Sequence, residues 1–389
     1  MDPFEDIRPY RDDEVRPVLD RLLKNDELVA AMTRLRFPRA AHRYGPLLTP
    51  LVRLGLRRQV APVRDVHGMQ LVVEQYMADV IGRTSAGFTV SGVERLPPRR
   101  PCLFISNHRD IAMDPAFVNY ALYHGGHDTA RIAIGDNLLT KDYAADLMRL
   151  NKSFIVKRSA KGPRQMLAAY RQLSGYVRNS IVQDRVPVWI AQREGRAKDG
   201  YDETEVAIVK MLAMSQDKAS ESFADFIRSL RIVPVAISYE YDPLDQSKAR
   251  ELETIARTGR YDKGEQEDVR SIALGIAGRK GAVHVAFGVP IDDCCDTPGQ
   301  VAEQIDRQVI ANYVLHPSNC FAYHALFGAY PQVPCGAGQH LFQAAQHPRQ
   351  EAAFKLRLAA MPAELRPYVL KMYANCIIRK QELGLVPGP

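Results

Sequence analysis

The sequence predicts an α/β fold, in which a mostly parallel sheet is covered by helices on both faces and has helical N- and C-terminal extensions. From residue 87, short apolar runs of strand length alternate with stretches of helical periodicity, a pattern typical of parallel sheets. Residues 10–86 and the chain beyond residue 297 show helical spacing instead. We therefore expect a helical region over 1–86, an α/β domain over 87–296 and a helical region over 297–389.

The N-terminal region is predicted to open with a helix over residues 14–35, which Pro38 ends. In residues 47–58 leucines alternate with arginines, as in an interfacial helix whose basic face meets lipid head groups. The alternative is an ordinary amphipathic helix packed on the next domain, and Pro50 and Gly55 weaken the helical pattern. Both interpretations remain open.

Strands and helices are expected to alternate through the central region. Apolar runs predict strands at 88–90, 103–106, 132–134, 154–156, 186–191, 232–238 and 283–287, with helices at 164–178 and 205–214 among them. A charged, mostly helical stretch over 242–280 separates the last two strands, and its role stays open. Thr297 followed by Pro298 is a typical start for the C-terminal helices.

The charge pattern points to an anionic partner. The formal net charge is +7, and arginines concentrate in residues 31–70, whereas residues 1–30 are acidic. Phosphate, coenzyme A, an acidic bilayer surface or nucleic acid would each fit this charge. No apolar run is long enough to span a bilayer, so a lipid substrate would be reached from the surface.

Several chemistries are disfavoured by missing motifs. The six cysteines include no C-x-x-C pair and no secretory leader precedes them, so we expect reduced thiols in a cytoplasmic setting. The histidines show no metal-binding grouping, and we predict no metal site. A serine hydrolase is disfavoured because G-x-S-x-G is absent, and the phosphate-binding and dinucleotide glycine motifs are missing too.

His108 is the first catalytic candidate. The apolar run 102–105 ends in Ser106 and Asn107, His108 follows at once, and a helical pattern then begins. This order places His108 at the rim of a sheet, where the active sites of open α/β sheets lie. A histidine there can take a proton from an alcohol, and the Asp114 carboxylate would fix its tautomer. Alternatively, His108 ends a strand while Asp110 or Asp114 caps the helix.

This stretch resembles the glycerophospholipid acyltransferases related to 1-acylglycerol-3-phosphate acyltransferase. Their first motif is Asn-His, four residues and Asp, often with Pro next; Asn107, His108, Asp114 and Pro115 match it, but five residues intervene. One extra residue turns a helical position by about 100°. Either a bulge in the turn restores the geometry or Asp110 takes the orienting role, and Pro115 favours Asp114.

The basic segment 149–164 places six cations around a short apolar strand, which suits a phosphate or, alternatively, a solvated basic turn. The family's second motif is an apolar pair ending in an Arg that contacts glycerol phosphate. By this resemblance Arg158 stands in the phosphate position, and Lys157 replaces the usual acid or aromatic residue.

The third and fourth family motifs also have counterparts. Glu194, Gly195 and Arg196 resemble Glu-Gly-Thr-Arg, but the Thr is missing and Arg196 stands one place early. Glycine allows close backbone approach, and Glu194 would hold glycerol hydroxyls, position Arg196 or form a plain surface ion pair. The apolar strand with Pro234 resembles the fourth motif, which is scaffold rather than chemistry.

The resemblance, which covers about residues 87–292, implies fatty acyl transfer from a thioester to a hydroxyl of glycerol 3-phosphate or a lysophospholipid such as lysophosphatidate. It implies His108 as the general base, Asp114 as its partner, and Lys157, Arg158 and Arg196 on the phosphate. Acyl-coenzyme A or acyl carrier protein would be the co-substrate, without another cofactor. We expect peripheral association with the cytoplasmic face of an anionic membrane and no nucleic acid partner. The alternative is a catalytically inactive peripheral membrane or lipid-binding protein that keeps the fold.

Overall fold

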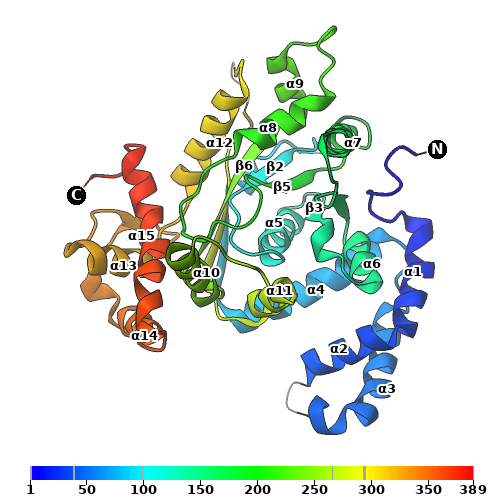
Figure 1. The fold of residues 1–389 in the computed structure, drawn as a ribbon, viewed down its shortest axis with the longest axis horizontal. Helices are drawn as coiled ribbons and strands as arrows, with labels where there is room; N and C mark the ends of the chain where they lie inside the picture. Colours follow the sequence, from blue (N-terminus) through cyan, green and yellow to red (C-terminus); the bar gives the residue numbers. More distant parts are fainter. Residues whose placement is uncertain (1, 38–39, 99, 265, 292–294, 389) are drawn as a thin grey trace. The chain divides into compact units, whose positions relative to one another are not determined.

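Two units make up the chain in the computed structural model, which describes residues 2–37, 40–98, 100–264, 266–291 and 295–388 (Figure 1). The smaller unit comprises Met1–Asp79 and Arg131–Gln172, and the larger comprises Val80–Ala130 and Leu173–Pro389. Helices α4 (Val66–Thr84) and α7 (Pro163–Val182) run from one unit into the other. The three-part division expected from the sequence stays a prediction.

The smaller unit packs helices around an apolar core and carries a parallel strand pair. The pair is β3 (Arg131–Gly135) with β4 (Ser153–Val156), and both strands lie where the sequence predicted them. The core includes Val15, Val18, Leu19, Leu22, Leu28, Val60, Val63, Met69 and Leu150. Its other elements are α1 (Asp12–Lys24), α2 (Asp26–Arg36), α3 (Ala41–Val60), η2 (Asp136–Leu138) and α6 (Asp142–Leu150).

The single helix predicted over residues 14–35 is two helices, α1 and α2, separated at Asn25. The Asn25 side chain accepts a hydrogen bond of 2.8 Å from the Leu28 amide and so caps α2. Apolar spacing continues across the break, which is why periodicity alone missed it.

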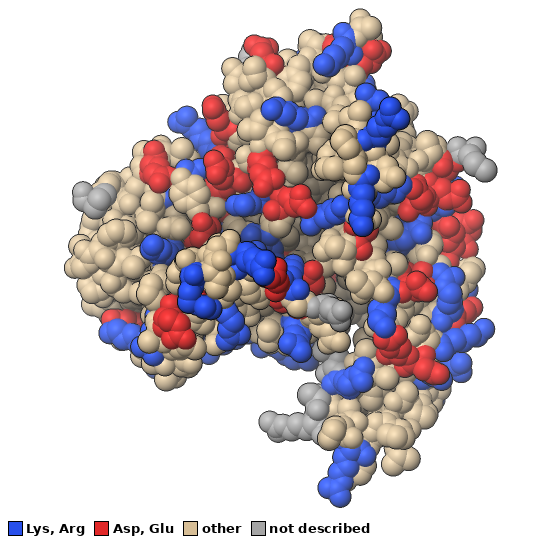
Figure 2. Space-filling model, viewed as in Figure 1, with Lys and Arg blue, Asp and Glu red and all other residues tan. Residues whose placement is uncertain are grey.

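Helix α3 confirms the helix predicted around residues 47–58, although it contains Pro46 and Pro50. Its leucines at one helical face are largely exposed: Leu47 at 72%, Leu51 at 65% and Leu54 at 46%. The sequence of α3 contains no acidic residue, whereas Figure 2 shows acidic and basic side chains mixed on the surface around α1. No helix among the described residues is both long and apolar enough to cross a bilayer.

In the larger unit, five strands lie in the order β1-β7-β6-β2-β5. Strand β2 pairs in parallel with both β5 and β6, β1 pairs in parallel with β7, and only β6 and β7 among these pairs are antiparallel. Every residue of β6 is buried, so both of its faces are covered. The predicted α/β class and every predicted strand are confirmed. The bounds are β1 (Ser85–Ser91), β2 (Leu103–Ser106), β5 (Val188–Ala191), β6 (Ile232–Tyr239) and β7 (Gly281–Phe287).

Helices fill the connections of the larger unit. The charged stretch 242–280 forms α10 (Asp245–Thr258) and α11 (Glu267–Ala277) between β6 and β7. The other helices of the sheet region are η1 (Val93–Arg95), α5 (Met113–His124), α8 (Val206–Leu212), η3 (Ala213–Ser215), α9 (Phe223–Leu230) and α12 (Pro298–Asn312). Thr297 caps α12 by accepting a hydrogen bond from the Gln300 amide, as its place before Pro298 predicted.

The C-terminal region is mostly helical, but it also contains a small hairpin that the sequence did not indicate. The hairpin joins β8 (Pro334–Cys335) to β9 (His340–Leu341). The C-terminal helix α15 contacts α10, α12 and α13, so this region packs onto the sheet domain (Figure 1). Its remaining elements are α13 (Pro317–Phe327), η4 (Ala344–Gln346), α14 (Pro348–Ala359), η5 (Ala363–Leu365) and α15 (Arg366–Glu382).

The cysteines that the structure describes are all buried, namely Cys102, Cys295, Cys320, Cys335 and Cys376. Cys294, which the sequence places beside Cys295, lies outside the described residues.

Candidate active site

The position of His108 is fixed by Asn107, which directly follows β2. The Asn107 Oδ1 atom accepts a hydrogen bond of 2.8 Å from the Ile237 amide, and its Nδ2 donates to the Ile237 carbonyl at 3.0 Å. This fully buried side chain therefore continues the pairing of β2 with β6 beyond the last residue of the strand. As predicted, His108 lies at the carboxyl ends of parallel strands, between β2 and α5.

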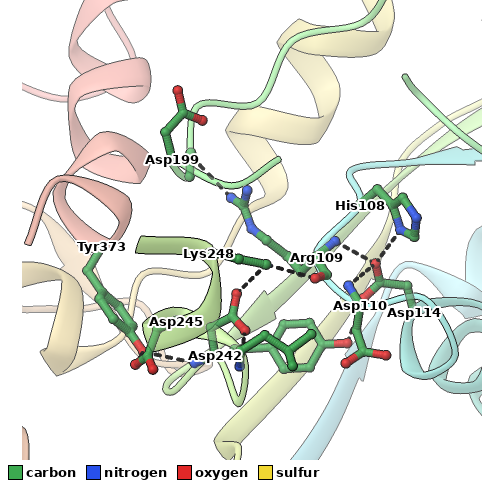
Figure 3. Close-up of polar contacts among 12 residues, drawn as sticks. His108, Arg109, Asp110, Asp114, Asp199, Asp242, Asp245, Lys248 and Tyr373 are labelled. Carbon is green, nitrogen blue, oxygen red and sulfur yellow. Dashed lines mark hydrogen bonds and ion pairs between the residues drawn. The ribbon is translucent and has the colours of Figure 1, made fainter. Parts of the chain in front are cut away.

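The imidazole of His108 contacts the carboxylate of Asp114 (Figure 3). The distance from Nδ1 to Oδ2 is 2.9 Å, and the two side chains are 14% and 0% exposed. The same Oδ2 accepts from the amides of Arg109 at 2.6 Å and Asp110 at 2.9 Å, while the Tyr239 hydroxyl donates to Oδ1 at 2.6 Å. An ionised carboxylate only accepts, so this contact requires a proton on Nδ1, and in the neutral imidazole that leaves the lone pair on Nε2.

The extra residue between His108 and Asp114 is accommodated in a turn before α5. The Asp110 Oδ1 atom accepts hydrogen bonds of 2.9 Å from the amides of Ala112 and Met113, at the first residues of the helix. Asp114 can therefore reach back to the imidazole. Of the two candidates that the sequence left open, Asp114 is the carboxylate in contact with His108.

Asp110 is a second buried carboxyl group, and it lies in the turn between His108 and Asp114. Burial raises the pKa of Asp110 to about 6, and the charge of Asp114 acts in the same direction. Within the described part of the chain, its Oδ2 has no hydrogen-bond partner. Gly275 of α11 packs against this oxygen so closely that a Cβ atom there would lie 2.0 Å away.

The third predicted motif lies beside His108. The amide of Gln192 donates to the Ser106 carbonyl at 2.8 Å, and the amide of Ala197 donates to the His108 carbonyl at 2.9 Å. The intervening Glu194 is exposed, Gly195 has a φ of +76° and Arg196 is half-buried. The structure thus brings Glu194, Gly195 and Arg196 to the rim that carries His108.

The second predicted motif follows β4 in the smaller unit. Lys157 forms an ion pair with Asp6, and its Nζ also donates to Gln172 Oε1 at 2.9 Å. The Arg158 amide donates to Asp136 Oδ1 at 3.0 Å, and its guanidinium lies against Gly135, where a Cβ atom would be 2.9 Å from Nε. Lys157 and Arg158 therefore lie in a turn at the carboxyl end of a parallel strand.

Arg109 and Asp202 form a buried ion pair that sequence reasoning missed. The Arg109 guanidinium contacts Asp202 Oδ2 at 2.6 Å and the Gly200 carbonyl at 3.3 Å. Burial disfavours the charged guanidinium, but Asp202 together with Cys376, Tyr313 and Asp242 outweighs this effect, and the pKa of Arg109 is raised. Only 5% of Arg109 is exposed, so its guanidinium is not a solvated cation.

Tyr239 and Lys248 were also missed. Tyr239 ends β6 at the rim that holds His108, so a polar residue at that strand end was a usable signal. Lys248 lies in α10, and nothing in its local sequence distinguishes it from a surface lysine. The described residues contain no group of three or more His, Cys, Asp or Glu side chains that could hold a metal ion.

Comparison with known proteins finds a family match in the central region. Residues 87–238 match a family model described as Acyltransferase. No curated protein matches the chain. Among solved structures, the 1-acyl-sn-glycerophosphate (LPA) acyltransferase PlsC from Thermotoga maritima is similar, with a TM-score of 0.38 and 14% sequence identity. That similarity covers 73% of this chain and 92% of that one.

Proposed function

Through residues 87–238 the chain belongs to the acyltransferase family, and on that premise we propose which acyl transfer it catalyses. The protein moves a fatty acyl group from a thioester, acyl-coenzyme A or acyl carrier protein, to a hydroxyl of glycerol 3-phosphate or a lysophospholipid such as lysophosphatidate. The observation that carries this proposal is the 2.9 Å contact between His108 Nδ1 and the fully buried carboxylate of Asp114.

His108 acts as the general base in this proposal. With Nδ1–H donated to Asp114, Nε2 accepts the proton of the acceptor hydroxyl while its oxygen attacks the thioester carbonyl. The new C–O bond forms, the C–S bond breaks, and the imidazolium returns its proton to the thiolate that leaves. Asp114 stabilises the imidazolium, and its hydrogen bonds from Arg109, Asp110 and Tyr239 hold the carboxylate in place.

The acceptor phosphate is assigned to the cations of the second and third motifs. Arg196 lies one residue from Ala197, whose amide is bonded to the His108 carbonyl, and it is half-buried as a phosphate-binding side chain would be. Glu194 holds the glycerol hydroxyls or positions Arg196, and the open φ > 0 backbone at Gly195 lets the ligand approach closely. On the resemblance of their motif alone, Arg158 and Lys157 are proposed as further phosphate ligands.

The lipid acceptor implies a membrane surface. We assign peripheral association with the cytoplasmic face of an anionic membrane to α3, because its three exposed leucines stand beside Arg57 and Arg58. No cofactor other than the acyl donor enters this reaction.

The test mixes purified protein with palmitoyl-coenzyme A and an acceptor panel of glycerol 3-phosphate, lysophosphatidate and an amino-acid-derived lysolipid. Free thiol reports turnover, and mass spectrometry of the lipid product separates transfer from hydrolysis. His108→Ala should lower kcat by about 10²- to 10⁴-fold, because it removes the general base. His67→Ala is the matched control, since His67 is an exposed histidine of α4.

Equal thiol release by wild type and His108→Ala would contradict the catalytic assignment. Binding of lysolipid vesicles without turnover by the wild type would instead support the alternative of an inactive lipid-binding protein. The contact between His108 and Asp114, kept despite the extra residue, argues against that alternative.

A further inference from the structure

Lys248 reaches the candidate active site from α10, outside the region that matches the family model. Its side chain is only 3% exposed, and its Nζ donates a hydrogen bond of 2.8 Å to the carbonyl oxygen of Arg109, the residue after His108. The same ammonium forms an ion pair with Asp242 (Figure 3). The charged stretch 242–280 therefore places a buried cation in contact with the backbone of the residue that follows the histidine.

The carbonyl that Lys248 contacts belongs to the peptide group between Arg109 and Asp110. The N–H of that same peptide group donates to Asp114 Oδ2 at 2.9 Å, and this oxygen also holds His108 Nδ1. Ammonium, peptide group, carboxylate and imidazole thus stand in one series of hydrogen bonds. Because hydrogen bonds in series polarise one another, the ammonium strengthens the amide as a donor to Asp114.

Charge balance keeps Lys248 in this position. Burial lowers the pKa of Lys248, the nearby cations Arg196 and Arg109 act in the same direction, and Asp242 opposes them. A buried ion pair of this kind rarely stabilises a fold more than well-packed apolar side chains would. Its presence beside the histidine therefore favours a role in the site over a role in stability alone.

The start of α10 is itself held by the C-terminal helices. The Asp242 amide donates to the Tyr373 hydroxyl oxygen at 2.9 Å, and that hydroxyl donates to Asp245 Oδ2 at 3.0 Å. Arg357 of α14 also contacts Asp245 and donates to the Asp242 carbonyl at 2.7 Å. Helices α14 and α15 thereby fix the place from which Lys248 extends.

We propose that Lys248 is a positioning residue, which holds and polarises the peptide group between Arg109 and Asp110 and so sets the hydrogen bonding of Asp114 to His108. This inference rests on the proposed function of that site. It gives the stretch 242–280, whose role the sequence left open, a part in the reaction.

The test variant is the double substitution Lys248→Met with Asp242→Asn, because Lys248→Met alone would leave a buried carboxylate without its partner. We expect kcat to fall about tenfold, as for loss of one hydrogen bond to a charged group, while the acceptor KM changes less than twofold. The acid limb of the pH profile of kcat/KM should also move upward by about half a unit. The reason is that a less polarised amide leaves more negative charge on the carboxylate facing the imidazole.

Two controls separate this effect from general damage. Lys263→Met removes a lysine of the same stretch whose ion pair with Asp268 is partly exposed, and it should keep the wild-type kcat and profile. Lys248→Arg keeps a buried cation with donors and should leave the acid limb in place. An unmoved limb in the double variant, or the same shift in Lys248→Arg, would overturn the proposal.

Hydrogen exchange of the segment 107–114, read by mass spectrometry, tests Lys248 without turnover. The Asp110 amide should exchange at least about fivefold faster in the double variant than in wild type or Lys263→Met. Unchanged exchange would overturn the role of Lys248 even in an active enzyme. A wild type that acylates no acceptor would overturn the proposed function, while the exchange result would still decide whether Lys248 holds the turn.

Discussion

Asp114 accepts hydrogen bonds from an imidazole, two amides and a tyrosine hydroxyl, and its own side chain is fully buried. A buried carboxylate is tolerated only with such a set of donors, because its charge has lost its water. The orientation of His108 therefore depends on residues drawn from the turn after β2 and from the end of β6.

Tyr239→Phe should lower the free energy of unfolding by about 2 kcal/mol, because it removes a buried hydrogen bond of 2.6 Å to a charged oxygen. Urea denaturation at pH 7 measures this change. Tyr201→Phe is the control, since its hydroxyl bonds the largely exposed Glu382 and should contribute less than about 1 kcal/mol. Equal losses of unfolding free energy in the two variants would show that the buried hydrogen bond to Asp114 stabilises the fold no more than the exposed one to Glu382.

Asp110→Asn should stabilise the protein at neutral pH. Burial raises the pKa of Asp110 to about 6 in the folded chain, above its unfolded value, so folding holds this proton more tightly. Stability consequently declines as pH rises from about 4 to about 6, and the ionised group is a net burden at pH 7. Asparagine keeps the acceptor for the Ala112 and Met113 amides without the charge.

The expected gain for Asp110→Asn is about 2 kcal/mol at pH 7 and close to zero at pH 4, measured by denaturant unfolding at both values. Asp225→Asn should show no gain at pH 7, because its hydrogen bonds to Ser222 and Arg228 lower the pKa of that exposed carboxyl group. A gain for Asp110→Asn that persisted at pH 4 would contradict this account.

At the scale of elements, the loop 199–202 joins α15 to the buried Arg109. The side chain of Asn375 donates to the Asp199 carbonyl at 2.8 Å, and Arg379 donates to the Asp202 carbonyl at 3.1 Å. Gly200 has a φ of +74°, and a Cβ atom there would lie 1.9 Å from the Met372 carbonyl oxygen. The loop can approach α15 this closely only because residue 200 has no side chain.

Gly200→Ala should therefore destabilise the fold by more than the cost of placing an alanine at a positive φ. Gly259→Ala provides the comparison, since Gly259 ends α10 with a φ of +82° and has nothing within 4 Å of its Cβ position. We expect a loss of about 1 kcal/mol for Gly259→Ala and at least about 2 kcal/mol more for Gly200→Ala. Thermal unfolding monitored by circular dichroism measures both losses. A loss for Gly200→Ala no larger than that for Gly259→Ala would contradict this expectation.

The sequence predicted the strands well because each is an apolar run with clear ends, and the motif spacing located His108 at a strand end. It could not predict the break at Asn25, where the apolar periodicity continues, or the antiparallel direction of β7. Asp202 and Lys248 reach the site by long-range packing, which local pattern does not encode. The choice between Asp110 and Asp114 required the actual turn geometry.

For the whole molecule, we expect α3 to mediate binding to phosphatidylglycerol vesicles in a sedimentation assay. Replacing Leu47, Leu51 and Leu54 together by Ser should weaken binding at least tenfold, because each leucine contributes about 1.5–3 kcal/mol on burial. Added salt should weaken it further, given the net charge of +7. Leu356→Ser, which alters a similarly exposed leucine of α14, should have no effect. Undiminished vesicle binding by the triple variant would show that α3 is not the membrane-binding element.

The antiparallel pairing of β6 with β7 determines which part of the chain can vary without disturbing the sheet. Tyr239 pairs with Val283, so the chain leaves β6 and enters β7 at the same rim of the sheet, the one that His108 occupies. The segment that contains α10 and α11 is therefore an insertion whose two ends both lie at the candidate active site. Lengthening, shortening or exchanging it would change the surroundings of that site, while every strand keeps its neighbours.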